Sequence, residues 1–160
     1  WENAPLTKPP TKQSTAILHE KAYVRLLGLP KKDTEATLFG IPMVENVGGE
    51  IDYLMLRRLA KATVFATIQE PWRESTSPIV KKVSRVPVKA GGKEVPEHEA
   101  YAMEITLKNA ERRVFFVNYS KGLKKIGKVT TNAEVATWNL GKANAVEKPT
   151  YTNGKSFSVK

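Results

Sequence analysis

The sequence predicts an α+β fold whose elements follow one another in the order β-α-β-β-α-β. Four short runs rich in Val, Ile, Leu and aromatic residues predict strands at residues 23–29, 50–56, 61–68 and 100–107. Two stretches between them, residues 33–47 and 72–83, carry apolar residues at the spacing of an amphipathic helix. At 160 residues, one domain with an appendage is the expected organisation.

The first predicted strand and helix follow from local patterns. Val24 and Leu26 alternate with larger or charged neighbours, which is typical of a strand. Asp33 or Thr34 is expected to cap the first helix. Pro42 disagrees with that helix, because a proline removes a hydrogen bond from a helix interior. Gly48-Gly49 ends it.

The second half of the pattern predicts a hairpin, a helix and a last strand. The tight basic turn at residues 57–60 is expected to join the second and third strands as a hairpin. Ile79, Val80 and Val83 form the apolar stripe of the second helix, which Pro78 divides into two short pieces. Because both predicted helices contain a proline, the alternative fold is a mostly β barrel or sandwich in which the C-terminal strands join the first three.

The positive charge is concentrated toward the C-terminus. The net charge is +10, of which residues 1–21 contribute +1, residues 22–108 contribute +2 and residues 109–160 contribute +7. The predicted organisation is an N-terminal arm (1–21), a domain (22–108) and a basic, β-rich extension (109–160). Such asymmetry indicates a polyanionic partner, with nucleic acid ahead of an anionic membrane surface; simple solubility is the competing explanation.

Four segments of the predicted domain resemble an RNA recognition motif. They are YVRLLGLP, GGEIDYLML, KATVFATIQEP and GGKEV followed by YAMEITL, and together they cover about residues 23–108. The resemblance implies a ferredoxin-like fold. It also implies RNA bases stacked on aromatic side chains of the first and third strands.

At the positions that match those aromatic residues, the domain looks like a degenerate RNA recognition motif. These positions are Arg25, Thr63 and Phe65, so only one of the three is aromatic. Tyr53 and Met55 would add stacking surface from the second strand. We therefore expect the domain to dock and a separate segment to bind most of the RNA. The predicted RNA-binding residues of the domain are Arg25, Tyr53, Arg57, Arg58 and Phe65.

The basic extension supplies that segment. RRVFFVNYSK predicts a strand, and the lysines that follow it are interleaved with Gly and apolar residues. We expect phosphate contacts from Lys121, Lys124, Lys125 and Lys128. The aromatic residues Tyr119, Trp138, Tyr151 and Phe157 suit either base stacking or packing on the domain, and packing is the favoured interpretation.

These observations predict a non-catalytic, RNA-associated structural subunit of a ribonucleoprotein of the ribosomal or organellar RNA-processing type. The expected partners are RNA and the protein subunits of a larger complex, with no membrane and no small-molecule substrate. The alternative is a protein–protein scaffold whose sheet face docks a partner through Arg25, Leu27, Tyr53, Met55 and Phe65.

Other function classes lack their usual signatures. The chain has no Cys, no phosphate loop and no dinucleotide fingerprint, so we expect no enzyme, no cofactor and no metal. Glu94, Glu97, Glu99 and Glu104 surround His98 in the sequence, and we interpret them as a solvated loop. No apolar run reaches the roughly 18–20 residues of a membrane helix. The start at Trp1 favours an organellar, mitochondrial location over a cytoplasmic or nuclear one.

Overall fold

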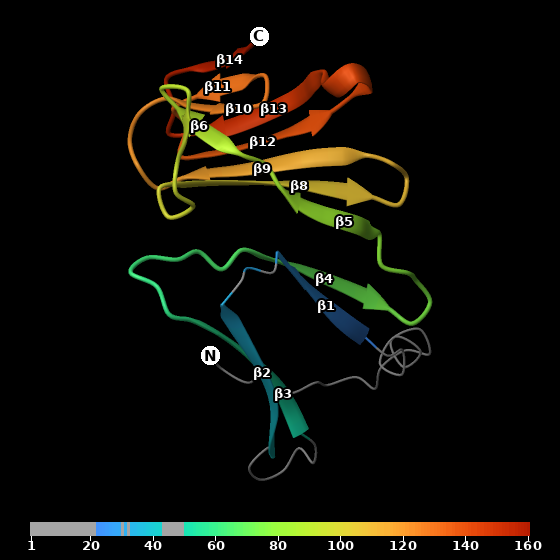
Figure 1. Cartoon of the computed structure of the whole chain (residues 1–160). Helices are drawn as coiled ribbons and strands as arrows, with labels where there is room; N and C mark the ends of the chain where they lie inside the picture. Colours follow the sequence, from blue (N-terminus) through green and yellow to red (C-terminus); the bar gives the residue numbers. More distant parts are fainter. Residues whose placement is uncertain (1–21, 30, 32, 43–49) are drawn as a thin grey trace, which may run out of the picture.

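The computed structural model describes residues 22–29, 31, 33–42 and 50–160, and they form an almost entirely β structure. Strands β1 to β4 make an elongated part that we call the ribbon, and strands β5 to β14 make a sandwich (Figure 1). In the described part of the chain, the only helical element is the short 3-10 turn Lys142–Asn144. The predicted N-terminal arm lies outside the described residues.

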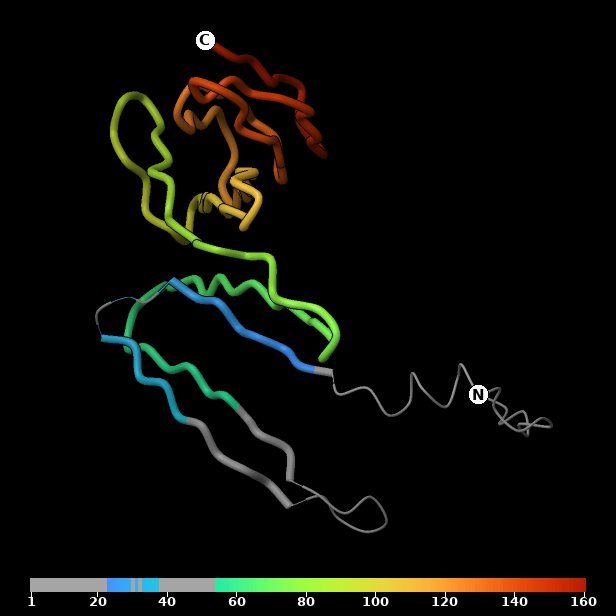
Figure 2. Tube along the Cα trace, turned by 90° about the vertical axis from the view of Figure 1, so that its right-hand side faces the viewer, coloured from blue at the N-terminus to red at the C-terminus, as the bar shows by residue number. Residues whose placement is uncertain are grey.

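The ribbon is built from two nested antiparallel pairs. Strand β1 (Ala22–Gly28) pairs with β4 (Thr67–Arg73), and β2 (Thr34–Pro42) pairs with β3 (Glu50–Arg58). Because β2 and β3 lie between β1 and β4 in the chain, the β2–β3 pair extends from the end of the β1–β4 pair. Figure 2 shows the ribbon beside the sandwich from a second direction.

The sandwich consists of two five-stranded antiparallel sheets. We call them the β9 sheet, in the order β13-β12-β9-β8-β5, and the β10 sheet, in the order β14-β11-β10-β6-β7. The β9 sheet contains β5 (Val80–Arg85), β8 (Ala100–Leu107), β9 (Arg112–Asn118), β12 (Val135–Leu140) and β13 (Val146–Thr152). The β10 sheet contains β6 (Val88–Ala90), β7 (Lys93–Glu94), β10 (Lys124–Ile126), β11 (Val129–Thr131) and β14 (Phe157–Val159).

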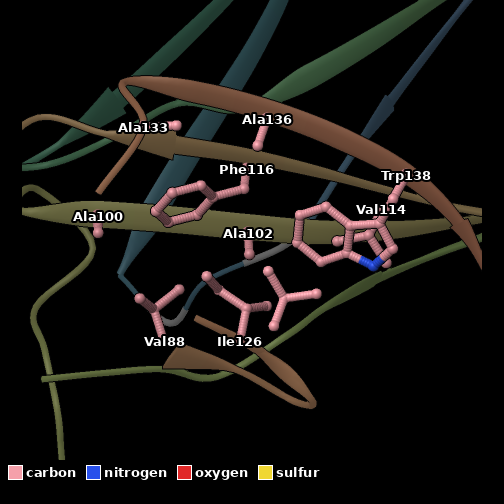
Figure 3. Close-up of a cluster of buried hydrophobic side chains, with 10 residues drawn as sticks. Val88, Ala100, Ala102, Val114, Phe116, Ile126, Ala133, Ala136 and Trp138 are labelled. Carbon is pink, nitrogen blue, oxygen red and sulfur yellow. The ribbon is translucent and has the colours of Figure 1, made fainter. Parts of the chain in front are cut away.

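The main core lies between these two sheets. Phe116 is fully buried and Trp138 is 3% exposed on the β9 sheet, and both face the aliphatic side chains of the β10 sheet (Figure 3). Small residues pack between the large ones, which lets the sheets approach closely. The buried cluster comprises Val88, Ala100, Ala102, Val114, Phe116, Ile126, Val129, Ala133, Ala136 and Trp138.

The predicted α+β order is wrong, and the structure fits the alternative β sandwich. The C-terminal strands do not join the first three predicted strands as that alternative expected, because β1, β3 and β4 pair only within the ribbon. Residues 34–42, expected in the first helix, form β2 and pair along their whole length with β3. Thr34, Thr37, Phe39 and Ile41 favour strand over helix because of their β-branched or aromatic side chains. The rest of that predicted helix, residues 43–49, lies outside the described residues.

The second predicted helix is also wrong. Residues 72 and 73 end β4, and β5 begins at Val80. Between them the chain turns, and the Thr76 amide donates to the Arg73 carbonyl at 2.9 Å. Pro71 and Pro78 both suit edge strands and turns better than helices.

Several strand predictions are confirmed, but one hairpin is not. The predicted strands at 23–29, 50–56 and 100–107 correspond to β1, β3 and β8, and RRVFFVN is β9. The predicted strand at 61–68 is instead β4, which begins at Thr67 and pairs with β1 across the ribbon. β8 and β9, on either side of the predicted boundary at residue 108, pair with each other in one sheet.

A buried carboxylate joins the ribbon to the sandwich. Glu70 on β4 is 7% exposed; its Oε1 accepts from the Val80 amide at 2.8 Å and from the Ile79 amide, and its Oε2 accepts from Arg25 Nε at 3.1 Å. Arg25 also donates to the Val80 carbonyl at 2.7 Å. Burial alone would raise the pKa of Glu70, but the hydrogen bonds from Val80, Arg25 and Ile79 hold that pKa below its ordinary value.

Phe116→Ala tests the position of the core. We expect it to lower the free energy of unfolding by about 3–5 kcal/mol, because it leaves a cavity at a fully buried site. The matched control is Phe115→Ala, which removes the same side chain from the more exposed opposite face of β9 and should cost far less. Urea unfolding of both variants measures the difference, and equal losses would contradict the assigned faces.

Glu70→Gln tests the joint between ribbon and sandwich. At neutral pH the substitution should lower the free energy of unfolding by about 3 kcal/mol, because it leaves Arg25 without its carboxylate. Since the folded pKa lies below the ordinary 4.5, this stabilisation is complete above pH 4.5 and is lost as the pH falls through the folded pKa. Chemical unfolding at stepped pH should therefore show the wild type and the variant converging below pH 4.5.

The control for this experiment is Glu35→Gln, because Glu35 pairs with Arg57 on the exposed surface of the ribbon. A gap between wild type and Glu70→Gln that stays constant in acid would show that ionised Glu70 does not stabilise the joint.

Candidate functional site

The outer surface of the β10 sheet carries a row of polar side chains. Val88, Ile126 and Val129 point into the core, so the residues that alternate with them point outward. The strand register aligns those outward residues across the sheet in the order Glu94, Lys89, Lys125, Thr130 and Ser158.

A groove of about 560 Å³ lies over the centre of this row. We call it the lysine groove. Lys89 and Lys125 line it from adjacent strands, and Leu123 adds an exposed apolar side chain. Its other lining residues include Pro87, Gly91, Gly92, Gly127 and Thr130.

Three glycines at the ends of the lysine groove take backbone conformations that favour glycine. Gly91 and Gly92 form the β6–β7 turn with φ of 55° and 82°, and Gly127 opens the β10–β11 turn with φ of 56°. Nothing lies within 4 Å of where a Cβ would stand on any of them. The ends of the groove are therefore open to the close approach of a ligand.

The two groove lysines are directly opposite each other. In an antiparallel pair, the Cβ atoms of such residues lie about 4.5–5.5 Å apart, and like charges at this position destabilise the sheet. The cross-strand neighbour on the other side of Lys89 is Glu94, but Glu94 forms its ion pair with Arg85 at 2.9 Å. The fold therefore places two lysines opposite each other at the centre of this groove, with the nearest carboxylate, Glu94, engaged by Arg85.

Arginines and lysines of the sandwich differ in their partners. Among the described residues, no ion pair reaches Lys89 or Lys125, whereas the arginines are paired. The arginine contacts are Arg85 with Glu94 and Glu97, Arg112 with Glu104, and Arg113 with Glu111, at 2.8–3.2 Å. Residues 80–160 hold sixteen Lys and Arg against seven Asp and Glu, so the sandwich has a net charge of +9. Much of this charge is uncompensated.

The four lysines predicted to contact phosphate do not share one surface. Lys125 lies in the lysine groove, and Lys121 is exposed in the turn before β10. Lys128 is exposed in the β10–β11 turn, where its Nζ donates to the Ala143 carbonyl at 3.1 Å. Lys124 also lines the lysine groove, but it is only 4% exposed and its Nζ donates to the Lys121 carbonyl at 3.1 Å. Because successive residues of a strand point to opposite faces, Lys124 points into the sandwich where Lys125 points outward.

The predicted RNA-binding residues of the ribbon are also separated. Arg25 is held by buried Glu70, and Arg57 pairs with Glu35 at 2.9 Å on the exposed hairpin. Arg58 lies over the ring of Phe65, with its guanidinium carbon 4.9 Å from the ring centre. Tyr53 is on β3, but its side chain lies outside the described residues. The structure brings together only Arg58 and Phe65 from this set.

The C-terminal aromatic residues mostly pack on one another. Trp138 is in the core and meets Phe157 edge-on at 6.0 Å, and Phe157 stacks on Tyr151 at 5.2 Å. Tyr119 is exposed. Trp138 and Phe157 are therefore part of the core packing that the favoured interpretation expected, whereas Tyr151 is 46% exposed although it stacks on Phe157.

The acidic residues around His98 do not converge. Glu94 and Glu97 bind Arg85, and Glu104 binds Arg112 through both oxygens at 2.8 Å. In the described residues, no group of three His, Asp or Glu side chains is arranged to hold a metal ion. No described helix is long and apolar enough to cross a membrane.

Comparison of the chain with protein-family models, with curated proteins and with solved structures found no match.

Sequence reasoning missed Lys89, the second lysine of the groove. The alternation in Val86, Val88 and Ala90 indicates a strand with Lys89 on its other face. That signal covers only three residues of strand, and nothing in the sequence indicates that this strand pairs with β10.

Substitution of the groove lysines tests whether their two positive charges repel each other. Lys89→Gln and Lys125→Gln should each raise the free energy of unfolding by a few tenths of a kcal/mol, because each removes a like-charge repulsion. In the double variant, the second substitution should raise the free energy of unfolding by less than it does as a single substitution, because the repulsion has already been removed. Urea unfolding at low and high salt measures this, since salt screens the repulsion. Fully additive effects would place the two ammonium groups too far apart to interact.

Proposed function

We propose that this protein is a non-catalytic structural subunit that binds the RNA backbone through the lysine groove of the β10 sheet. The observation that carries the proposal is the pair Lys89 and Lys125, directly opposite each other and without a carboxylate partner in the described chain. Two exposed lysines at one place on a sheet, with the nearest carboxylate engaged by Arg85, concentrate positive charge that attracts an anion.

Phosphate is the ligand group that this chemistry favours. Adjacent strands lie about 4.8 Å apart, so two ammonium groups on neighbouring strands can flank one phosphate. Binding a phosphate would replace the repulsion within the pair by two attractive contacts. The net charge of +9 on the sandwich would add long-range attraction for a polyanion.

The groove also supports backbone binding rather than reading of the bases. Its described lining contains no aromatic side chain on which a base could stack. Lysine contacts a phosphate as a point charge and carries no sequence information. Affinity would then come mainly from counterion release and would fall with salt.

A protein-docking scaffold remains the second candidate, and the ribbon supports it. Val24, Leu26, Met55 and Phe65 are exposed there. A two-stranded ribbon is only marginally stable in water by itself, so a partner that covered these side chains would stabilise it.

RNA binding by the full chain tests the proposal. Fluorescence anisotropy with a labelled single-stranded oligouridine, at about 50 mM and about 200 mM salt, should show affinity that falls as salt rises. Lys89→Gln/Lys125→Gln should weaken binding and reduce the slope of log K against log salt by about 0.7 for each lost phosphate contact.

The matched control is Lys81→Gln/Lys82→Gln, which removes two exposed charges from β5 in the other sheet. It should leave the slope close to that of the wild type. Equal slopes for the groove variant and the wild type would remove the groove from the interface. Binding to heparin but not to RNA would contradict RNA as the ligand. If the protein bound neither polyanion at low salt, the RNA-binding proposal would fail and protein docking by the ribbon would be favoured instead.

A further inference from the structure

A second cavity, separate from the lysine groove, lies where the ribbon meets the sandwich. This cleft has a volume of about 640 Å³, within the range of small-molecule sites. The ribbon contributes Arg58 and Phe65 to its wall, and the sandwich contributes Arg85, Glu97 and Tyr101. None of these residues lines the lysine groove.

Arg58 is fixed in the wall of the cleft before any ligand arrives. Its Nε and Nη2 donate to Thr34 Oγ1 at 2.9 and 2.7 Å, and its Nη1 donates to Thr63 Oγ1 and to the Val64 carbonyl. These four bonds leave one of the five guanidinium N–H groups for a ligand. Phe65 supports one face of the guanidinium. A cation held in place in this way loses little entropy on binding an anion.

The three atoms that accept these four hydrogen bonds from Arg58 are all neutral. The other two cations of the cleft, Lys31 and Arg85, share the carboxylate of Glu97 at 2.7 and 3.2 Å. The lining therefore has three cations against one carboxylate, and Arg58 has no carboxylate partner in the described chain. A half-buried charge without a counterion favours an anionic ligand.

Tyr101 adds an uncharged polar group to the same wall. Burial raises the pKa of its hydroxyl, and the charge of Glu97 adds to that shift while Arg85 opposes it. The hydroxyl is therefore protonated at neutral pH and is able to donate a hydrogen bond. With Leu56 and Val64 nearby, the cleft combines apolar surface with a few polar groups.

We propose that the cleft binds a small planar anion, that is, a ring system bearing a carboxylate or a phosphate. The oxyanion pairs with Arg58, and the ring lies against the platform formed by Arg58 and Phe65, since guanidinium planes and aromatic rings both stack on planar groups. A nucleoside monophosphate and an aromatic carboxylate share this chemistry. The inference is independent of RNA binding, because it uses a different cavity and different residues.

Isothermal titration calorimetry of the full chain with four probes tests this site. Adenosine 5′-monophosphate and benzoate each combine a ring with an oxyanion, whereas adenosine lacks the charge and inorganic phosphate lacks the ring. At least one of the first two should bind with one-to-one stoichiometry and about tenfold more tightly than adenosine and phosphate. Binding of both supports any planar oxyanion, and binding of the nucleotide alone identifies phosphate-bearing rings as the class.

Two variants and one control locate the binding. Arg58→Lys keeps the charge but removes the planar fork, and it should weaken binding by about tenfold or more. Phe65→Leu removes the aromatic platform and should weaken it less. Arg57→Lys is the control, because Arg57 is adjacent in sequence but pairs with Glu35 away from the cleft. Its affinity should equal that of the wild type.

The proposal is overturned if neither ring-bearing anion binds more tightly than adenosine and inorganic phosphate. Equal losses in Arg58→Lys and Arg57→Lys would also overturn it. Lys89→Gln/Lys125→Gln should leave these affinities unchanged, so a failure of RNA binding and a failure of the cleft are seen separately. Thermal unfolding of each variant verifies that it is folded.

Discussion

The carboxylate of Glu70 fixes the relation between the two parts of this molecule. It is buried on β4, receives Arg25 from β1 and accepts the backbone amides that lead into β5. One side chain thereby joins both strands of a ribbon pair to the first strand of the sandwich. Among the ribbon residues whose side chains the structure describes, no apolar side chain is fully buried, and this polar joint and the contact of Lys31 with Glu97 connect the ribbon to the sandwich. The cleft exists only while they do.

The sandwich separates its positive charges by residue type. Its arginines are engaged with carboxylates, where the planar guanidinium forms well-directed hydrogen bonds. The two groove lysines face the solvent on the β10 sheet without such partners. The first group stabilises the fold and the second is free to bind a ligand. Arg58, in the ribbon, belongs to neither group, because it is rigidly held but has no carboxylate partner. Of the charged residues in 109–160, which carry +7 of the net charge, only Lys124 and Lys125 line the lysine groove and none lines the cleft.

Period-two patterns correctly predicted β1, β3, β8 and β9 but missed β5, whose stripe of Ile79, Val80 and Val83 also suits a helix. The strand at residues 100–107 was predicted with the bounds that it has, because β8 lies in the middle of a sheet with its neighbours on both sides. The prediction failed at β2, where Leu38 and Phe39 are adjacent in sequence and no simple alternation separates helix from strand. In the candidate site, Lys125 was predicted from the lysine run, but Lys124 was not recognised as buried. The burial of Lys124 could have been predicted from Ile126, because residues two positions apart on a strand point to the same face. Lys89 was not predicted as a site residue, because its place beside Lys125 results from the pairing of β6 with β10, which the local sequence does not specify.

The most direct test of the RNA-binding account is an amide NMR titration of the full chain with a short single-stranded RNA. The account predicts that the largest shift changes fall on β6, β10 and β11, around Lys89, Lys125 and Thr130, while the amides of the β9 sheet and of the ribbon change little. Largest changes on the ribbon or on the outer face of the β9 sheet would contradict it. In that case the groove lysines would have no part in RNA recognition.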